Sequence, residues 1–176
     1  MPSALKACRG LSLFDLLITL AVLAILAQWL APGFGGLVAE QRRLAFAHEL
    51  ASDLRSARLE AVQRNRTVIL HPLDGDWAKG WRMVVDESGK GAADPGNPVV
   101  VQRLGDASVQ VIATSNLREQ LAFDYLGVPR LPNRGALAGT FHLCEAGNEA
   151  HRRVVVARTG RVRITREGQP TPLCPA

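Results

Sequence analysis

The sequence predicts an α+β fold in which one long N-terminal helix packs on a C-terminal domain of antiparallel strands. Three observations predict it: an apolar run near the N-terminus, helical spacing of apolar residues over 38–66, and short β-branched runs separated by turn residues over 67–176. The chain has 176 residues, of which 47% are hydrophobic and 21% are charged. These values are typical of one globular domain with an appendage, and they exclude wholesale disorder.

The apolar run extends from Leu11 to Ala31, and its only ionisable residue is Asp15. A helix of this length spans roughly 30 Å, which is the thickness of a bilayer core. A secretory signal peptide is one alternative, but the acid at the head of the run and the lack of a small-x-small cleavage site argue against it. Because a carboxylate in lipid is costly unless it is paired, we expect Asp15 to have a partner. We therefore predict that 11–37 forms the transmembrane and assembly part of the helix.

The stretch from Arg9 to Leu20 resembles the type III signal of type IV pilins and type II secretion pseudopilins. In that family a prepilin peptidase cuts after a glycine, which corresponds to Gly10, and methylates the new N-terminal residue, which corresponds to Leu11. Residues 1–10 are then the leader peptide. The acid at the fifth mature position, Asp15, meets the terminus of a neighbouring subunit during assembly. The family usually has Phe in place of Leu11 and Glu in place of Asp15, which implies slower processing and weaker pairing.

Helical periodicity continues after a proline and glycine cluster. The cluster, 32–36, predicts a bend or local melting of the helix. Beyond it, apolar residues recur at spacings of three and four, and charged residues occupy the other faces. The apolar residues are Leu44, Ala47, Leu50, Ala51, Leu54, Ala57, Ala61 and Val62. This pattern predicts an amphipathic helix over 38–66 that ends near Asn65 and buries its apolar stripe on the domain that follows.

The domain over 67–176 contains short apolar runs bounded by Gly, Pro, Asp and Asn, which predict strands. The predicted strands are 67–71, 81–85, 99–103, 109–113, 121–125, 140–144, 152–157 and 161–165. The segment 86–98 is rich in turn residues and predicts a long surface loop. We expect Trp77 and Trp81 to fill the core and assign them no site.

The order of these features narrows the resemblance. The helical segment Leu54 to Asn65 leads into a strand, and then Trp77 and the Gly80-Trp81 pair precede Val84-Val85-Asp86. This order resembles that of the minor pilins FimT and FimU and of their secretion-system relative GspH. The resemblance covers most of the chain and implies a pilin-like fold.

The chain has three cysteines, of which Cys8 lies in the predicted leader. The export signal places the remaining two, Cys144 and Cys174, in the periplasm, where an even pair of thiols normally oxidises. A disulfide closing about 30 residues stabilises a fold by roughly 3 to 4 kcal/mol. The alternative is a metal site at His142 and Cys144, but it lacks further ligands at a finger-like spacing. We expect a disulfide, no metal and no cofactor.

Arginine is concentrated near the C-terminus. The chain has a net charge of only +5, yet residues 150–166 hold six arginines and no acid. Thr159-Gly160 predicts the turn of a hairpin. On its second strand, Arg161 and Arg163 would point to one face, about 6.7 Å apart, and the apolar residues between and beyond them to the other.

A solvated strand face is one explanation of this arginine pair, and the family resemblance favours another. Gly160-Arg161-Val162-Arg163 matches the Gly-Arg-x-Arg element with which FimT-type minor pilins of naturally transformable bacteria hold DNA. The resemblance therefore implies Arg161 and Arg163 as DNA contacts. Arg158 and Arg166 are added to the predicted DNA contacts on the basis of their charge and position alone. Such contacts would engage successive phosphates without reading the bases.

The sequence has no nucleophile elbow, zincin motif, dinucleotide fingerprint or phosphate loop, so we predict that the protein is not an enzyme. Our first hypothesis is a minor type IV pilin that binds double-stranded DNA for uptake in natural transformation. Its partners would be other major and minor pilins, the prepilin peptidase and DNA. It would cross the bacterial inner membrane once, with its domain in the periplasm, and become extracellular in the pilus.

Two other functions remain open. One is a purely structural minor pilin or a GspH-like type II secretion pseudopilin, which primes or caps filament assembly. In that case the arginines contact an acidic face of a neighbouring subunit. The other is an ordinary exported soluble protein, whose mature N-terminus would lie well beyond Leu11.

Overall fold

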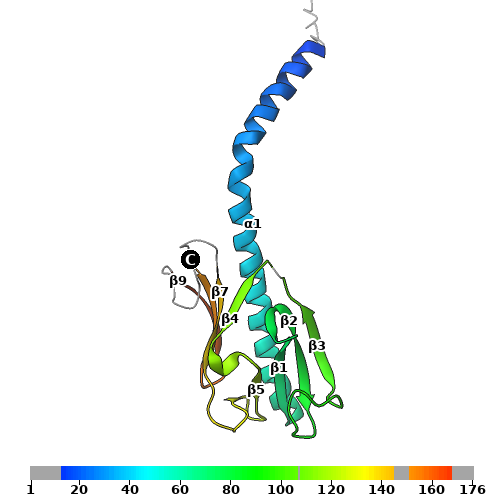
Figure 1. Cartoon of the computed structure of the whole chain (residues 1–176), viewed down its shortest axis with the longest axis vertical. Helices are drawn as coiled ribbons and strands as arrows, with labels where there is room; N and C mark the ends of the chain where they lie inside the picture. The colour runs from blue at the N-terminus through cyan, green and yellow to red at the C-terminus, as the bar shows by residue number, and fades with distance from the viewer. Residues whose placement is uncertain (1–12, 107, 145–150, 168–176) are drawn as a thin grey trace, which may run out of the picture. The chain divides into compact units, whose positions relative to one another are not determined.

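A computed structural model describes residues 13–106, 108–144 and 151–167, apart from the side chains of residues 27–34 and 167. The predicted leader, the cleavage pair Gly10 and Leu11, and Cys174 lie outside these residues. The chain divides into two compact units, Met1–Glu40 and Gln41–Ala176. Helix α1, Leu13–Arg64, passes from the first unit into the second (Figure 1).

Helix α1 continues without interruption through the proline and glycine cluster at 32–36. The local melting predicted there does not occur, because a proline removes only one hydrogen bond from the ladder and the flanking turns keep theirs. The predicted bend stays a prediction. The described residues include no helix whose length and apolar composition suit a membrane crossing.

The C-terminal end of α1 is fixed by a left-handed residue, Asn65, whose φ is 52°. The Asn65 N–H donates to the carbonyl of Val62 at 3.3 Å, and the Arg66 N–H donates to that of Ala61 at 3.2 Å. These two bonds form a Schellman motif, which satisfies carbonyls at the helix end and reverses the chain. The end predicted near Asn65 is therefore confirmed.

The domain contains two antiparallel sheets. The five-stranded sheet has the order β3-β2-β1-β5-β6, and the four-stranded sheet has the order β4-β7-β8-β9. The strands of the first sheet are β1 Thr67–Leu73, β2 Asp76–Asp86, β3 Val99–Leu104, β5 Leu121–Phe123 and β6 Pro129–Arg130. Those of the second are β4 Gln110–Ala113, β7 Gly139–Cys144, β8 His151–Val156 and β9 Val162–Glu167, and a short 3-10 helix, η1 Ser115–Leu117, follows β4.

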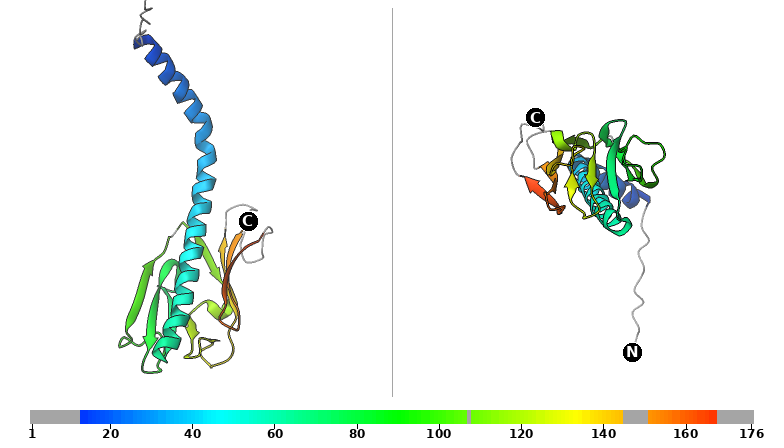
Figure 2. Two further views of the ribbon diagram at one scale, coloured as in Figure 1. Left: turned by 180° about the vertical axis from the view of Figure 1, so that it is seen from behind. Right: turned by 90° about the horizontal axis from the view of Figure 1, so that it is seen from below.

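The predicted strands correspond to strands of the structure, and the predicted loop at 86–98 connects β2 and β3. Strand β6 was not predicted, because it has two residues and begins with a proline, which gives no strand pattern. The α+β, pilin-like fold is confirmed: the C-terminal half of α1 lies along the inner faces of both sheets (Figures 1 and 2).

One core joins the C-terminal half of α1 to both sheets. The helix contributes Phe46, Ala47, Leu50, Ala51, Leu54, Ala57 and Ala61. Trp77 of β2 and Phe141 of β7 meet edge to face at 4.8 Å and so connect the two sheets. Both tryptophans are buried, as expected, but Val62 of the predicted stripe is 50% exposed. Val62 directly follows the fully buried Ala61, and the rotation of about 100° per residue in a helix places it at the margin of the stripe.

Candidate functional site

The arginine-rich segment forms a hairpin at the edge of the four-stranded sheet, because β9 is the last strand in its order. The Ala157 N–H donates to the carbonyl of Arg161 at 2.9 Å, and the Gly160 N–H donates to that of Ala157 at 2.8 Å. Gly160 has a φ of 77°, a conformation that favours glycine. The hairpin predicted around Thr159-Gly160 is confirmed.

The two faces of β9 differ as predicted. Arg161 and Arg163 are exposed, whereas Val162 between them is 7% exposed and belongs to the core. Ile164 also packs against the core. The apolar residues therefore anchor the strand and leave the arginine pair facing away from the core.

The other two predicted contacts lie differently. Arg158 is exposed in the turn, next to the pair. Arg166 is exposed as well, but strand alternation places it on the face of Val162 and opposite Arg152 of β8. Arg166 was grouped with Arg161 and Arg163 from the sequence because of its charge and position. In the structure, the alternation of side chains along the strand puts Arg166 on the opposite face.

Positive charge around the pair is not neutralised locally. Among the described residues, no carboxylate forms an ion pair with Arg158, Arg161 or Arg163. Two further arginines, Arg55 and Arg58, approach the same hairpin from α1. Such a concentration of one sign of charge attracts anionic polymers.

The contacts from α1 were not predicted. Arg55 Nη2 donates to the carbonyl of Val162 at 3.3 Å, and Arg58 Nε donates to that of Gly127, in the turn between β5 and β6, at 3.0 Å. The sequence contains one signal of these contacts, since Arg55 and Arg58 are three residues apart and so share a helix face. Their partners lie too far along the chain to be inferred from local patterns.

The β8–β9 turn at Gly160 and the β5–β6 turn at Gly127 belong to different sheets, and both pack against the Arg58 side chain. A Cβ atom at Gly160 would lie 2.5 Å from the Gly127 carbonyl oxygen and 3.0 Å from Arg58 Nε. A Cβ atom at Gly127, whose φ is 71°, would lie 3.0 Å from Arg58 Cγ and Nε. Gly160 therefore needs glycine for space as well as for conformation, whereas Gly127 needs it for conformation and packs closely against the Arg58 side chain.

The N-terminal assembly site is described only in part. Asp15 lies exposed in the first turn of α1, where a carboxylate interacts favourably with the helix dipole. Its predicted partner belongs to another subunit, so the pairing stays a prediction. Large apolar side chains are exposed on both sides of it along the helix: Leu13, Phe14, Leu16, Leu17, Ile18, Leu20, Val22, Leu23, Ile25 and Leu26.

The cysteine site is also described in part. Cys144 ends β7 and is 4% exposed, while Cys174 lies outside the described residues, so their disulfide stays a prediction. His142 shares its strand face with Cys144. No three His, Cys, Asp or Glu side chains of the described residues are placed to hold a metal ion together.

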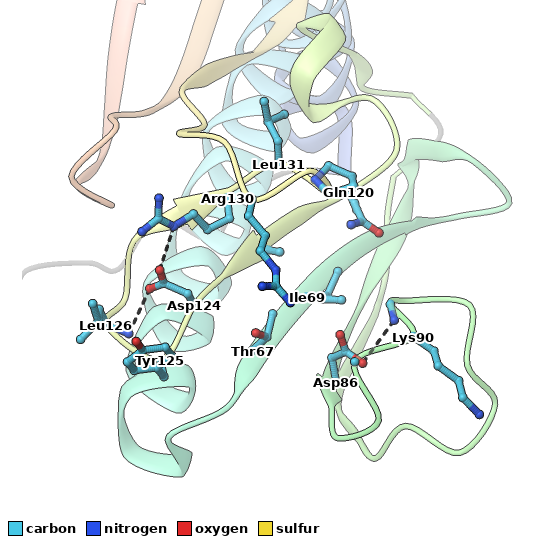
Figure 3. A pocket seen from close by; sticks show the side chains of 15 residues that line it. Thr67, Ile69, Asp86, Lys90, Gln120, Asp124, Tyr125, Leu126, Arg130 and Leu131 are labelled. Atoms are coloured by element: carbon cyan, nitrogen blue, oxygen red, sulfur yellow. Dashed lines mark hydrogen bonds and ion pairs between the residues drawn. The ribbon is translucent and has the colours of Figure 1, made fainter.

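A cavity of about 720 Å³ lies on the outer face of the five-stranded sheet (Figure 3). Its lining includes Asp124, whose Oδ2 accepts a hydrogen bond from Arg130 Nε at 2.8 Å. Burial raises the pKa of the Asp124 carboxyl, but Arg130 and the N–H groups of Val128 and Leu126 outweigh it, and the pKa lies below its usual range. This cavity was not predicted, and its ion pair serves to fix the β5–β6 turn that reaches Arg58.

The family model for the type II transport protein GspH matches residues 47–160, which cover the buried stripe of α1 and most of both sheets. The chain belongs to the GspH family.

Relatives of this GspH-family chain include a pilin-like protein and a minor pilin. The pilin-like protein PilA1 of Thermus thermophilus is 30% identical over 164 residues, which make up 89% of this chain and 97% of PilA1. A crystal structure of the type IV minor pilin FimU from Pseudomonas aeruginosa matches with a TM-score of 0.55 and 27% identity, covering 72% of this chain and 90% of FimU. A second crystal form of FimU matches with the same TM-score and 25% identity, covering 69% of this chain and 91% of FimU. The protein is thus a minor pilin or pseudopilin of the type IV pilus and type II secretion family.

The GspH match ends at Gly160, directly before the arginine pair. It includes Arg55, Arg58 and Gly127, which hold the hairpin, but neither Arg161 nor Arg163. Membership of the GspH family therefore does not by itself give the arginine pair a function.

Proposed function

We propose that this GspH-family protein is a minor type IV pilin that holds double-stranded DNA through Arg161 and Arg163 during uptake in natural transformation. The observation that carries the proposal is the exposure of both arginines on one face of an anchored edge strand. Arg158, exposed in the adjacent turn, supplies a third contact. Arg166 meets the DNA only where the duplex also reaches the opposite face of β9.

The chemistry of the pair suits a phosphate backbone. A guanidinium group presents a planar fork of donors that binds phosphate oxygens in bidentate fashion. Two such groups on alternate strand positions are about 6.7 Å apart, and they engage successive phosphates. Binding is therefore independent of base sequence, and its affinity falls steeply with salt.

Assembly uses the N-terminal part of α1. The prepilin peptidase cleaves after Gly10 and methylates Leu11, the apolar run holds the chain in the inner membrane, and Asp15 then pairs with a neighbouring subunit in the pilus. The exposed apolar side chains of α1 over 13–26 support this role. In cells that contain the peptidase, Gly10→Ala should leave the chain as the slower-migrating precursor; unchanged mobility would contradict the prepilin assignment.

The DNA-binding proposal is tested with the full chain in a non-ionic detergent and a fluorescent DNA duplex across a salt series. Each phosphate contact contributes about 0.9 to the slope of log affinity against log salt. The variant Arg161→Gln/Arg163→Gln should lose most affinity and about 2 from this slope. Arg66→Gln/Arg118→Gln removes two other exposed arginines and should change the affinity less than about threefold. Failure of the unmodified chain to bind at low salt would refute the proposal.

A structural pseudopilin of type II secretion is the second candidate, because the matching family model is that of a type II transport protein. In that role the protein primes or caps a filament, and the arginine pair contacts an acidic face of the next subunit. Neither role is catalytic. Genes for secretion components beside the coding gene would favour this candidate, and genes for pilus and DNA-uptake components would favour the first.

A further inference from the structure

The arginine pair lies on an edge strand and on the turn before it; Val162 and Ile164 anchor the strand through their side chains, while the backbone lies at the edge of the sheet. Arg161 follows a tight turn, and within the described residues β8 is the strand that pairs with β9. Edge strands and turns of this kind open locally at low free energy unless something else fixes them. We propose that Arg55 and Arg58 of α1 are positioning residues, which fix the backbone that carries Arg161 and Arg163 for DNA binding. This inference rests on the function proposed above.

Arg55 forms a hydrogen bond with Val162, which lies between the two proposed DNA contacts, Arg161 and Arg163. Its Nη2 donates to the carbonyl oxygen of Val162 at 3.3 Å. The Val162 carbonyl belongs to the peptide unit that joins Val162 to Arg163, so this bond fixes the backbone between the two arginines. The bond comes from the helix, and it adds to the bonds that β9 makes with β8.

Arg58 acts on the turn. Its side chain packs between Gly127 and Gly160, and its Nε donates to the Gly127 carbonyl at 3.0 Å. The space at Gly160 is so restricted that a Cβ atom there would lie 2.5 Å from the same carbonyl oxygen. The β8–β9 turn therefore rests on a second turn, and Arg58 connects both to the helix.

The base of this arrangement is rigid. Leu54 and Ala57, the helix neighbours of Arg55 and Arg58, are fully buried in the core. Lysine cannot replace Arg58, because a methylene group would occupy the position of the donating Nε. A site that is ordered before binding loses less conformational entropy on binding, so the affinity depends on these two side chains even where they do not touch DNA.

Positioning and direct contact give different signatures. The salt slope counts the phosphates that are neutralised, whereas ordering of the site changes the affinity at constant slope. The charge-conserving variant Arg55→Lys/Arg58→Lys should weaken duplex binding by about 5- to 10-fold with an unchanged salt slope. In hydrogen exchange, the Ala157 and Gly160 amides, which make the bonds of the turn, should exchange about 10-fold faster, and the amides that pair β1 with β2 should not.

The control is Arg64→Lys on the same helix, where the Arg64 side chain is exposed and pairs with Glu60. It should match the unmodified chain in both measurements. Gly160→Ala, which changes no charge, disturbs the same turn and should reproduce the loss of affinity at constant slope. Circular dichroism and the unfolding midpoint identify any variant that fails to fold.

Three results would overturn the inference. Binding equal to that of Arg64→Lys would show that the two arginines do not position the pair, even with faster exchange. A salt slope reduced by about 2 would show that they contact phosphates themselves. Unchanged exchange at Ala157 and Gly160 would show that they do not hold the turn. If the unmodified chain does not bind the duplex, the proposed function itself is wrong, and the exchange data still report whether α1 holds the hairpin.

Discussion

The carboxylate of Asp53 on α1 accepts a hydrogen bond from the indole Nε1 of Trp81 on β2 at 2.8 Å. Asp53 is 5% exposed and Trp81 is fully buried. Arg103 of β3 donates to the same carboxylate oxygen through Nε at 3.2 Å and also pairs with Glu49 at 3.4 Å. Oδ2 of the buried carboxylate therefore accepts two hydrogen bonds, and it joins the helix to two strands of the five-stranded sheet.

Replacement of Asp53 by alanine should destabilise the protein by about 2–3 kcal/mol, because it leaves the buried indole N–H of Trp81 without an acceptor. The free energy of unfolding can be measured by urea denaturation. Ser52→Ala, at an exposed position on the same helix, should change it by less than about 0.5 kcal/mol. Equal effects of the two changes would show that the hydrogen bond contributes no stability.

The buried stripe of α1 gives a second prediction. Leu50 is fully buried and Leu59, on the same helix, is 59% exposed. Leu50→Asp should destabilise the protein by several kcal/mol, because it buries a charge and removes core contacts, and Leu59→Asp should change stability by less than about 0.5 kcal/mol. Denaturation of the two variants in parallel tests this; a neutral Leu50→Asp would contradict the packing of the helix.

The turn glycines allow strain and crowding to be separated. Gly89 and Gly160 have nearly the same φ, 74° and 77°, but a Cβ atom at Gly89 would meet nothing within 4 Å. Gly89→Ala should therefore cost about 1 kcal/mol for conformation alone. Gly160→Ala should cost a further 1–3 kcal/mol for overpacking against the Gly127 carbonyl. If the two variants are equally stable, the two turns are not in close contact.

His71 on β1 makes stability depend on pH. Burial lowers the pKa of His71 below its usual range; the hydrogen bond from Nδ1 to the Pro72 carbonyl opposes this, and Arg82 lowers the pKa further. The unfolded chain then takes up a proton at about pH 6.5, before the folded chain does. The contribution of His71 is complete above that pH and declines as the pH falls towards the folded pKa.

This effect can be assigned with two variants. The unfolding midpoint of His71→Gln should fall less between pH 7.5 and pH 5 than that of the unmodified protein. Ser52→Ala, at an exposed position of α1, removes no titratable group and should keep the pH dependence unchanged. If His71→Gln loses stability with acid as steeply as the unmodified protein, other groups cause the effect.

The predicted disulfide has a direct test in the intact mass. The proposed cleavage after Gly10 would remove Cys8, and the mature chain should then gain about two mass units on reduction if Cys144 and Cys174 are paired. Peptide mapping without reduction should show these two cysteines in one linked species. Cys174→Ser should lower the stability of the oxidised protein by roughly 3 kcal/mol and leave that of the reduced protein nearly unchanged.

The sequence predicts features that repeat locally. The spacing of Leu50, Leu54 and Ala61 shows the buried face of α1, and β-branched runs show the strands, because both patterns arise from the geometry of one element. The alternation of Arg161 and Arg163 with Val162 was predicted for the same reason. Val62 and Arg166 fit the local patterns of spacing and charge, yet one is exposed and the other lies on the opposite face.

Features that join distant segments were not predictable. From the sequence, Asp53 is interpreted as a charged residue on an exposed face of the helix. In the structure it is a buried hydrogen-bond acceptor, because folding places Trp81 next to it. The contact of Arg58 with Gly127 and Gly160 joins three elements that are separated by many residues. No local spacing encodes these contacts, since they depend on how the two sheets meet on the helix.

The position of β9 at the edge of its sheet has a consequence for solubility. In the described part of the chain it is the last strand, and such an edge is a template on which another copy can add a strand and aggregate. Arginines in and next to this strand oppose that contact, since two such edges carry like charges. The residues proposed to hold a nucleic acid thereby also protect the chain from self-association before it reaches the filament.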